Sequence, residues 1–157
     1  MFLTIKEMKD VLYGYQADEI AEGDEQIIEN GINAAVNEVR SYFTASNQKQ
    51  WSDGRPRYDI QKIFGATGSG RDAWILRMCK TVAAWNIIEL SNPDIIYEKV
   101  KDRYDIVIKT LEKIAGIGQS ANSPALTPDL PTVDPGSESG SDMEPFRFGS
   151  RLKFRHE

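Results

Sequence analysis

Residues 71–118 read RDAWILRMCKTVAAWNIIELSNPDIIYEKVKDRYDIVIKTLEKIAGIG, and they contain the clearest helical pattern of the chain. Apolar side chains recur in both halves at steps of three and four, which is the spacing of an amphipathic helix. The main row of the first half is Trp74, Met78, Val82, Trp85 and Ile88, with Ile75 alongside. The row of the second half is Ile96, Val100, Tyr104, Val107, Leu111 and Ile114, with Ile108 alongside. The stretch therefore predicts two long helices.

The expected boundary between these helices is Asn92-Pro93. Asn92 suits the cap of the second helix, Pro93 its first position, and Asp94 the positive end of its dipole. Gly116 supplies a left-handed residue at which the second helix ends. Because the connection is short, the two helices are expected to be antiparallel neighbours.

Two further helices are expected upstream. Thr4 and Glu7 have the spacing of a capping box, so a helix should begin there, with Ile5, Met8, Val11, Leu12 and Tyr15 on one face. A longer helix should open at Asp24, with Ile27, Ile28, Ile32, Ala35, Val36, Val39 and Phe43 at helical spacing. Gly31 lies inside it and either permits close packing or weakens that turn.

Residues 45–70 are the least regular part, with turn formers around Gly54 and Pro56. Residues 58–64 fit either a helical turn or a short extended segment. The following GATGSGRD lacks the Lys-Ser/Thr ending of a Walker loop and the dinucleotide spacing, so a flexible loop is favoured over a phosphate site. Asp72 or Ser69 is the expected cap of the next helix. The residues assigned to an oligomer interface are Trp51, Arg55, Arg57 and Arg71, although Trp51 suits packing on its own domain equally well.

Composition restricts the class of protein. The chain has 157 residues, a net charge of -5 and one cysteine, Cys79, which is expected to be a buried inert thiol in a reducing compartment. Trp74 and Trp85, three turns apart, are both expected in the core. No apolar run approaches the roughly 18 residues of a membrane span, and residues 1–10 do not resemble a secretion signal. We expect an intracellular protein at synthesis that has no membrane contact.

Catalytic and metal-binding patterns are not evident. The pairs Glu25/Glu29 and Glu98/Asp102 lie one turn apart among other charges, which is typical of solvated helix faces. His156 is isolated in the tail. No nucleophile–base set or metal-ligand spacing is present, so the sequence predicts neither an enzyme nor a cofactor site.

The chain changes character after Gly118. Residues 119–145 hold five of the seven prolines and five acidic residues but no Lys or Arg, a composition not expected to order itself. If extended, these residues would reach about 90 Å. The last segment, 146–157, is basic and alternates aromatic or apolar with charged residues, as a strand does. Its expected partner-binding residues are Phe146, Arg147, Phe148, Arg151, Leu152, Lys153, Phe154 and Arg155. Strand addition to a partner's sheet is favoured over folding back on its own domain and over nucleic-acid binding.

The fold expected from these patterns is all-α, a small bundle of about four helices with a long extended C-terminal tail. Its parts are a helical domain at 1–118, an acidic linker at 119–145 and a basic aromatic docking segment at 146–157.

The order of motifs resembles a phage family. MFLTIKEM, a helix ending VNEVRSYF, a loop with RPRYD and the closing YEKVKDRYDIVIKTLEKIAGIG are similar to the Mu-type head–tail joining proteins, also called head-completion or adaptor proteins. The resemblance covers about residues 1–118 and is strongest at 100–116; a basic segment containing FGS after a loose linker is also similar. Many members carry a compact Arg-Tyr-Pro-Leu loop where this chain has the longer residues 45–70.

The resemblance implies a structural protein of the virion, made in the host cytoplasm and located at the head–tail junction. It implies a dodecameric ring beneath the portal protein that extends the DNA channel, lets DNA pass without specific binding and recruits neck, stopper or tail proteins. It implies no catalysis and no cofactor. The alternative is a small helical nucleic-acid-binding packaging or regulatory protein, for which no helix with clustered Lys or Arg is evident.

Overall fold

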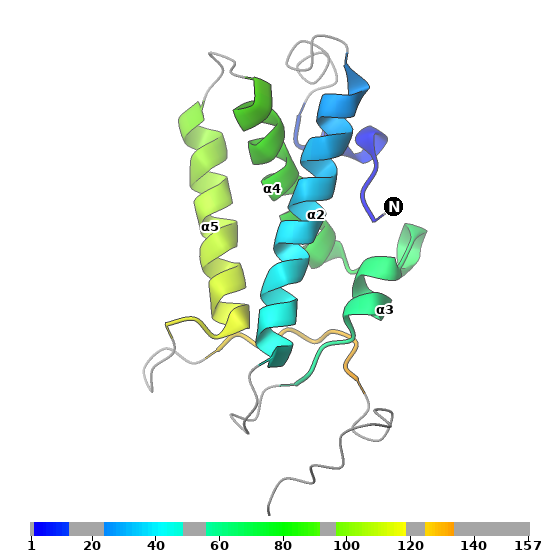
Figure 1. Ribbon diagram of the computed structural model, residues 1–157, viewed down its shortest axis with the longest axis vertical. Helices are drawn as coiled ribbons and strands as arrows, with labels where there is room; N and C mark the ends of the chain where they lie inside the picture. The colour runs from blue at the N-terminus through cyan, green and yellow to red at the C-terminus, as the bar shows by residue number, and fades with distance from the viewer. Residues whose placement is uncertain (1, 13–23, 49–55, 92–96, 119–124, 134–157) are drawn as a thin grey trace, which may run out of the picture.

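The protein is all-α, as predicted, and three long helices lie side by side in it (Figure 1). The computed structural model describes residues 2–12, 24–48, 56–91, 97–118 and 125–133. The long helices are α2 (Glu25–Gln48), α4 (Ala73–Ser91) and α5 (Tyr97–Ala115), and the short ones are η1 (Ile5–Asp10), α3 (Ile60–Gly65) and η2 (Gly68–Gly70). The expected corner at Asn92-Pro93 and the expected core position Ile96 lie outside the described residues.

Each of the three long helices packs against the other two, and α4 is the most enclosed of them. Its buried side chains are found around most of its circumference, which is typical of an enclosed helix. They include Ile75, Cys79, Val82, Ala83 and Ile87, none of which has exposed surface. Helices α2 and α5 instead each bury one face. The helical spacing of apolar residues that the sequence predicted is therefore confirmed in both.

Gly31 lies where α2 and α4 approach each other closely. A Cβ atom added there would lie 2.6 Å from Cγ1 of Ile87, and the backbone of Ile87 would be 3.4 Å away. Gly31 is therefore in α2 for close helix packing, which settles the alternative left open by the sequence.

The helix ends follow the predicted signals. The backbone N–H and the hydroxyl of Thr4 both donate to Oε2 of Glu7, at 3.0 and 2.9 Å. Asp72, rather than Ser69, caps α4, because its Oδ1 accepts from the N–H groups of Trp74 and Ile75 at 2.9 Å each. The element after Thr4 is a 3-10 helix, η1, and its Met8 is buried as expected.

Gly116 ends α5 in the left-handed conformation, with φ of 71°. The N–H of Ile117 donates to the carbonyl of Glu112 at 2.8 Å, and that of Gly116 donates to Lys113 at 3.2 Å. These two bonds make a Schellman motif, so the predicted stop is confirmed.

The central irregular region is more helical than expected at its start. Helix α2 continues to Gln48, and the segment from Tyr58 combines both proposed conformations. Tyr58 is extended and forms an isolated bridge, whereas Ile60–Gly65 is the short helix α3, capped by Asp59.

The prediction that both tryptophans lie in the core is wrong for Trp74, which is 36% exposed, while Trp85 is 9% exposed. The two do share a face of α4, as their spacing requires. At Trp85 that face is covered by Tyr104 of α5, and the centroids of the two stacked rings are 5.2 Å apart. The hydroxyl of Tyr104 donates to Oε1 of Glu38 in α2 at 2.8 Å. At Trp74 the same face borders an open groove, so the side chain stays partly exposed.

Candidate interaction surfaces

Two surfaces of the described structure offer groups for a partner: a groove along α4 and α5, and the base of the bundle where residues 125–133 cross it. Within the described ranges, no cluster of three or more His, Cys, Asp or Glu is placed to hold a metal ion. The same ranges contain no helix with the length and apolar character needed to span a bilayer.

Cys79 has the inert environment predicted for it. Its side chain is fully buried in α4, and burial raises the pKa of the thiol to about 12. The thiolate, which is the reactive form, is therefore negligible near neutral pH.

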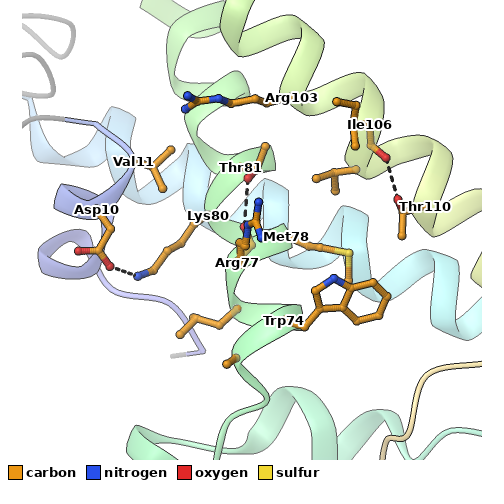
Figure 2. Close-up of a pocket in the computed structure, with 13 residues that line it drawn as sticks. Asp10, Val11, Trp74, Arg77, Met78, Lys80, Thr81, Arg103, Ile106 and Thr110 are labelled. Carbon is orange, nitrogen blue, oxygen red and sulfur yellow. Dashed lines mark hydrogen bonds and ion pairs between the residues drawn. The ribbon is translucent and has the colours of Figure 1, made fainter.

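The groove has a volume of about 640 Å³ and is bordered by η1, α4 and α5 (Figure 2). Trp74 lies at one end and Arg103 at the other. Ile106, on its α5 side, is 64% exposed, the largest exposure of a large apolar side chain among the described residues. Met78 is nearly fully buried beneath them. The groove thus presents exposed apolar surface at Trp74 and Ile106.

The charged groups of the groove are mainly basic. Lys80 forms an ion pair with Asp10 of η1, so its charge is compensated. Arg77 and Arg103 also border the groove, and both are exposed. No carboxylate in the described part of the chain forms an ion pair with either of them. The groove therefore has a basic rim around an apolar floor.

Residues 125–133, which we call the strap, cross the base of the bundle (Figure 1). The N–H of Leu126 donates to the carbonyl of Lys113 at the end of α5, at 3.1 Å. At the other end, the N–H of Asp59 donates to Pro131 and the N–H of Val133 donates to Arg57, each at 2.9 Å. These two bonds flank an antiparallel bridge between Tyr58 and Thr132. The strap thereby connects the end of α5 to the segment before α3.

The expectation that residues 119–145 do not order themselves is wrong for the strap. The average composition of residues 119–145 is polar, but the segment includes Leu130, which is buried at 7% exposure. The strap also contains Pro128 and Pro131, whose fixed φ reduces the entropy that is lost on ordering. Residues 119–124 and 134–145 of the predicted linker lie outside the described residues.

Tyr58 anchors the strap to the bundle. Its ring is buried and meets Phe43 of α2 edge-on at 5.4 Å. Asn47, near the end of α2, holds the backbone of Tyr58 from both sides: its Nδ2 donates to the carbonyl at 2.7 Å, and its Oδ1 accepts from the N–H at 2.9 Å. The sequence patterns did not predict this contact, although an aromatic residue directly after Arg-Pro-Arg in a polar loop was a signal for it.

Replacing Leu130 with alanine is expected to loosen the strap without unfolding the bundle. Truncating a buried leucine costs about 2 kcal/mol at the least, which corresponds to about 30-fold easier opening of the strap. Hydrogen exchange of the Asp59 and Val133 amides should therefore accelerate by about that factor. Exchange in the middle of α4 is the internal control and should not change; equal acceleration there would contradict a separately opening strap.

Of the residues predicted for an oligomer interface, the structure describes Arg57 and Arg71, and their role in an interface stays a prediction. Arg71 is used inside the chain: Nη1 donates to the carbonyl of Phe2 at 2.6 Å and to Glu7 at 3.0 Å, and Nε donates to Gly68 at 3.0 Å. Arg57 is exposed at the base, where its carbonyl accepts the bond from the strap.

Several predicted residues lie outside the described ranges. These are Trp51, Arg55 and the eight partner-binding residues Phe146, Arg147, Phe148, Arg151, Leu152, Lys153, Phe154 and Arg155. Their roles stay predictions.

Similarity to known proteins gives no further assignment of these surfaces. No protein-family model matches the chain, and neither the curated proteins nor the solved structures include a significant match.

Proposed function

We propose that this protein is a structural connector of a bacteriophage or prophage, which assembles as a homo-oligomeric ring beneath the portal and recruits neck or tail proteins. The observation that carries the proposal is the strap. It fixes Val133 beside Arg57 at the base of the bundle, so the basic C-terminal segment leaves each subunit from a defined point.

The strap also shortens the reach of that segment. Twelve residues separate Val133 from Phe146, and they span about 40 Å when extended, compared with about 90 Å for a tether that begins at Gly118. A shorter tether raises the effective concentration of the segment near the base. This favours docking on a protein that touches the same end of the bundle, as a portal or a neighbouring subunit of a ring would.

The composition of the bundle suits a channel wall. The chain is acidic overall, and a wall of this charge repels the DNA backbone rather than binding it. DNA would then pass through the ring without specific contacts, and the chain would need neither catalysis nor a cofactor. In this proposal the mature location is the head–tail junction of the virion.

The test is the molar mass of the full-length protein, measured alone and after addition of the portal protein encoded in the same phage genome. We expect a monomer alone and a ring on the portal. A variant lacking residues 146–157 should remain folded and monomeric but bind the portal more weakly. Failure of the full-length protein to bind the portal would contradict the connector, whereas unchanged binding of the shortened variant would contradict only the role of the tail.

The alternative, a nucleic-acid-binding protein, has one observation in its favour: Arg77 and Arg103 are exposed on the same groove. Two arginines neutralise few phosphates, so the expected affinity for DNA is low. A salt-dependent mobility shift of DNA by the full-length protein, lost in the double variant Arg77→Glu/Arg103→Glu, would support this alternative.

A further inference from the structure

The groove between α4 and α5 combines two features that call for an occupant. Trp74 and Ile106 keep apolar surface in water, at 36% and 64% exposure (Figure 2). Arg77 and Arg103 border the same cavity, and no described carboxylate forms an ion pair with them. A ligand that complements both features carries negative charges and at least one flexible apolar side chain.

One segment of this chain has that composition. Residues 138–144 read ESGSDME: Glu138, Asp142 and Glu144 provide the carboxylates, and Met143 provides an unbranched side chain that adapts to irregular apolar surfaces. The segment contains no basic residue. The basic residues begin at Arg147, so the last twelve residues of the chain are poorly matched to a basic groove and stay available for another partner.

The length of the connection permits docking within one molecule. The strap holds Val133 at the base, and eight residues, 134–141, lie between it and Asp142. Extended, they span about 30 Å. Helix α4 has 19 residues and is therefore about 28 Å long, so the connection reaches along the bundle from its base.

We propose that the α4–α5 groove is the docking site for the acidic segment 138–144 of the same chain. Carboxylates of the segment pair with Arg77 and Arg103, and Met143 covers apolar surface at Trp74 and Ile106. Tethering through the strap gives the segment an effective concentration on the order of millimolar, which favours the same chain over a second copy. The proposal goes beyond the connector function and does not depend on it.

The experiment measures the mobility of a nitroxide label attached to the full-length variant Ser141→Cys. Labelling is specific because the other thiol, Cys79, is fully buried. We expect a slow component in the electron paramagnetic resonance spectrum, which reports a docked segment. The additional changes Arg77→Glu/Arg103→Glu should abolish this component. The matched control Lys99→Glu/Lys109→Glu changes the charge equally on exposed positions outside the groove and should keep it.

Charge exchange provides the decisive result. Adding Asp142→Arg and Glu144→Arg to the Arg77→Glu/Arg103→Glu protein should restore the slow component, which general unfolding would not allow. A fully mobile label in the parent protein would overturn the proposal, as would a slow component that persists in the Arg77→Glu/Arg103→Glu variant. Docking of a second copy in the groove would also overturn the proposal. In that case the molar mass would be doubled at high protein concentration, and the slow component would disappear on dilution.

Discussion

Replacing Gly31 with valine is expected to lower the free energy of unfolding by about 3 kcal/mol. Gly31 is buried where α2 meets α4, and even a single added carbon would lie 2.6 Å from Cγ1 of Ile87. Ile87 has no exposed surface, so its side chain has no open space to move into. The two central helices must therefore separate, and packing along their contact is lost. Chemical denaturation of the purified protein measures the effect.

Two controls separate this contact from the general effect of changing a glycine. Gly65→Ala places a methyl group where nothing lies within 4 Å, so its effect should stay within about 0.5 kcal/mol. Gly31→Ala should destabilise, although alanine favours helix over glycine by about 1 kcal/mol. Ile87→Ala should destabilise alone but make Gly31→Ala nearly harmless. A Gly31→Val protein as stable as the parent would contradict the close helix contact.

Replacing Arg71 with methionine is expected to lower the free energy of unfolding by about 2 kcal/mol at neutral pH, because a charged hydrogen-bond partner is removed from Glu7. Arg71 joins the start of the chain to the loop before α4 through the carbonyl of Phe2, the carboxylate of Glu7 and the carbonyl of Gly68. Its side chain is only 11% exposed, so water does not fully replace these bonds. Thermal and chemical denaturation measure the loss.

The same ion pair predicts how stability depends on pH. The hydrogen bond from Arg71, helped by Thr4, lowers the pKa of Glu7 from 4.5 to about 2. The folded protein therefore holds this carboxylate ionised where the unfolded chain protonates it. The stabilisation is fully present above pH 4.5 and is lost as the pH falls toward 2. Since Glu7 is 28% exposed, we expect about 2 kcal/mol from this group, less than the full shift would give.

Comparing variants separates the contribution of Glu7 to the pH dependence of stability from that of the other carboxylates. The difference in stability between the parent protein and Glu7→Gln should be large at pH 7 and shrink between about pH 4.5 and 2. Arg71→Met should remove most of that difference, because the two residues act as a pair. A difference that stays constant with pH would contradict the lowered pKa.

The sequence predicted the long helices well because the residues that determine a helix lie close together along the chain. The apolar rows of α2, α4 and α5, the cap at Asp72 and the stop at Gly116 each depend on residues a few positions apart. Trp74 shows the limit of this reasoning. Its position on the face of α4 was correct, but its exposure depends on how far α5 covers that face, which no local pattern contains.

The contacts that organise the base of the bundle were not predictable in this way. Tyr58 and Thr132 are distant in sequence and meet through a single bridge, without the repeated alternation that identifies a strand. Likewise, Arg71 donates hydrogen bonds to Phe2 and Glu7 at the start of the chain, and no local pattern around residue 71 predicts these partners. For the candidate surfaces, the sequence supplied the basic and acidic segments, and the structure supplied the groove and the point from which the tail departs.

The strap has a mechanical consequence. A force that pulls on the chain beyond residue 133 first loads the bond from Val133 to Arg57, and only then the bond between Asp59 and Pro131. These two bonds lie on opposite sides of the bridge, so a pull directed away from the bundle loads them one after another. Tyr58, with its ring buried against Phe43 and its backbone held by Asn47, resists the pull from the other side. Tension on the tail is therefore released at the base of the bundle before it reaches the last turn of α5.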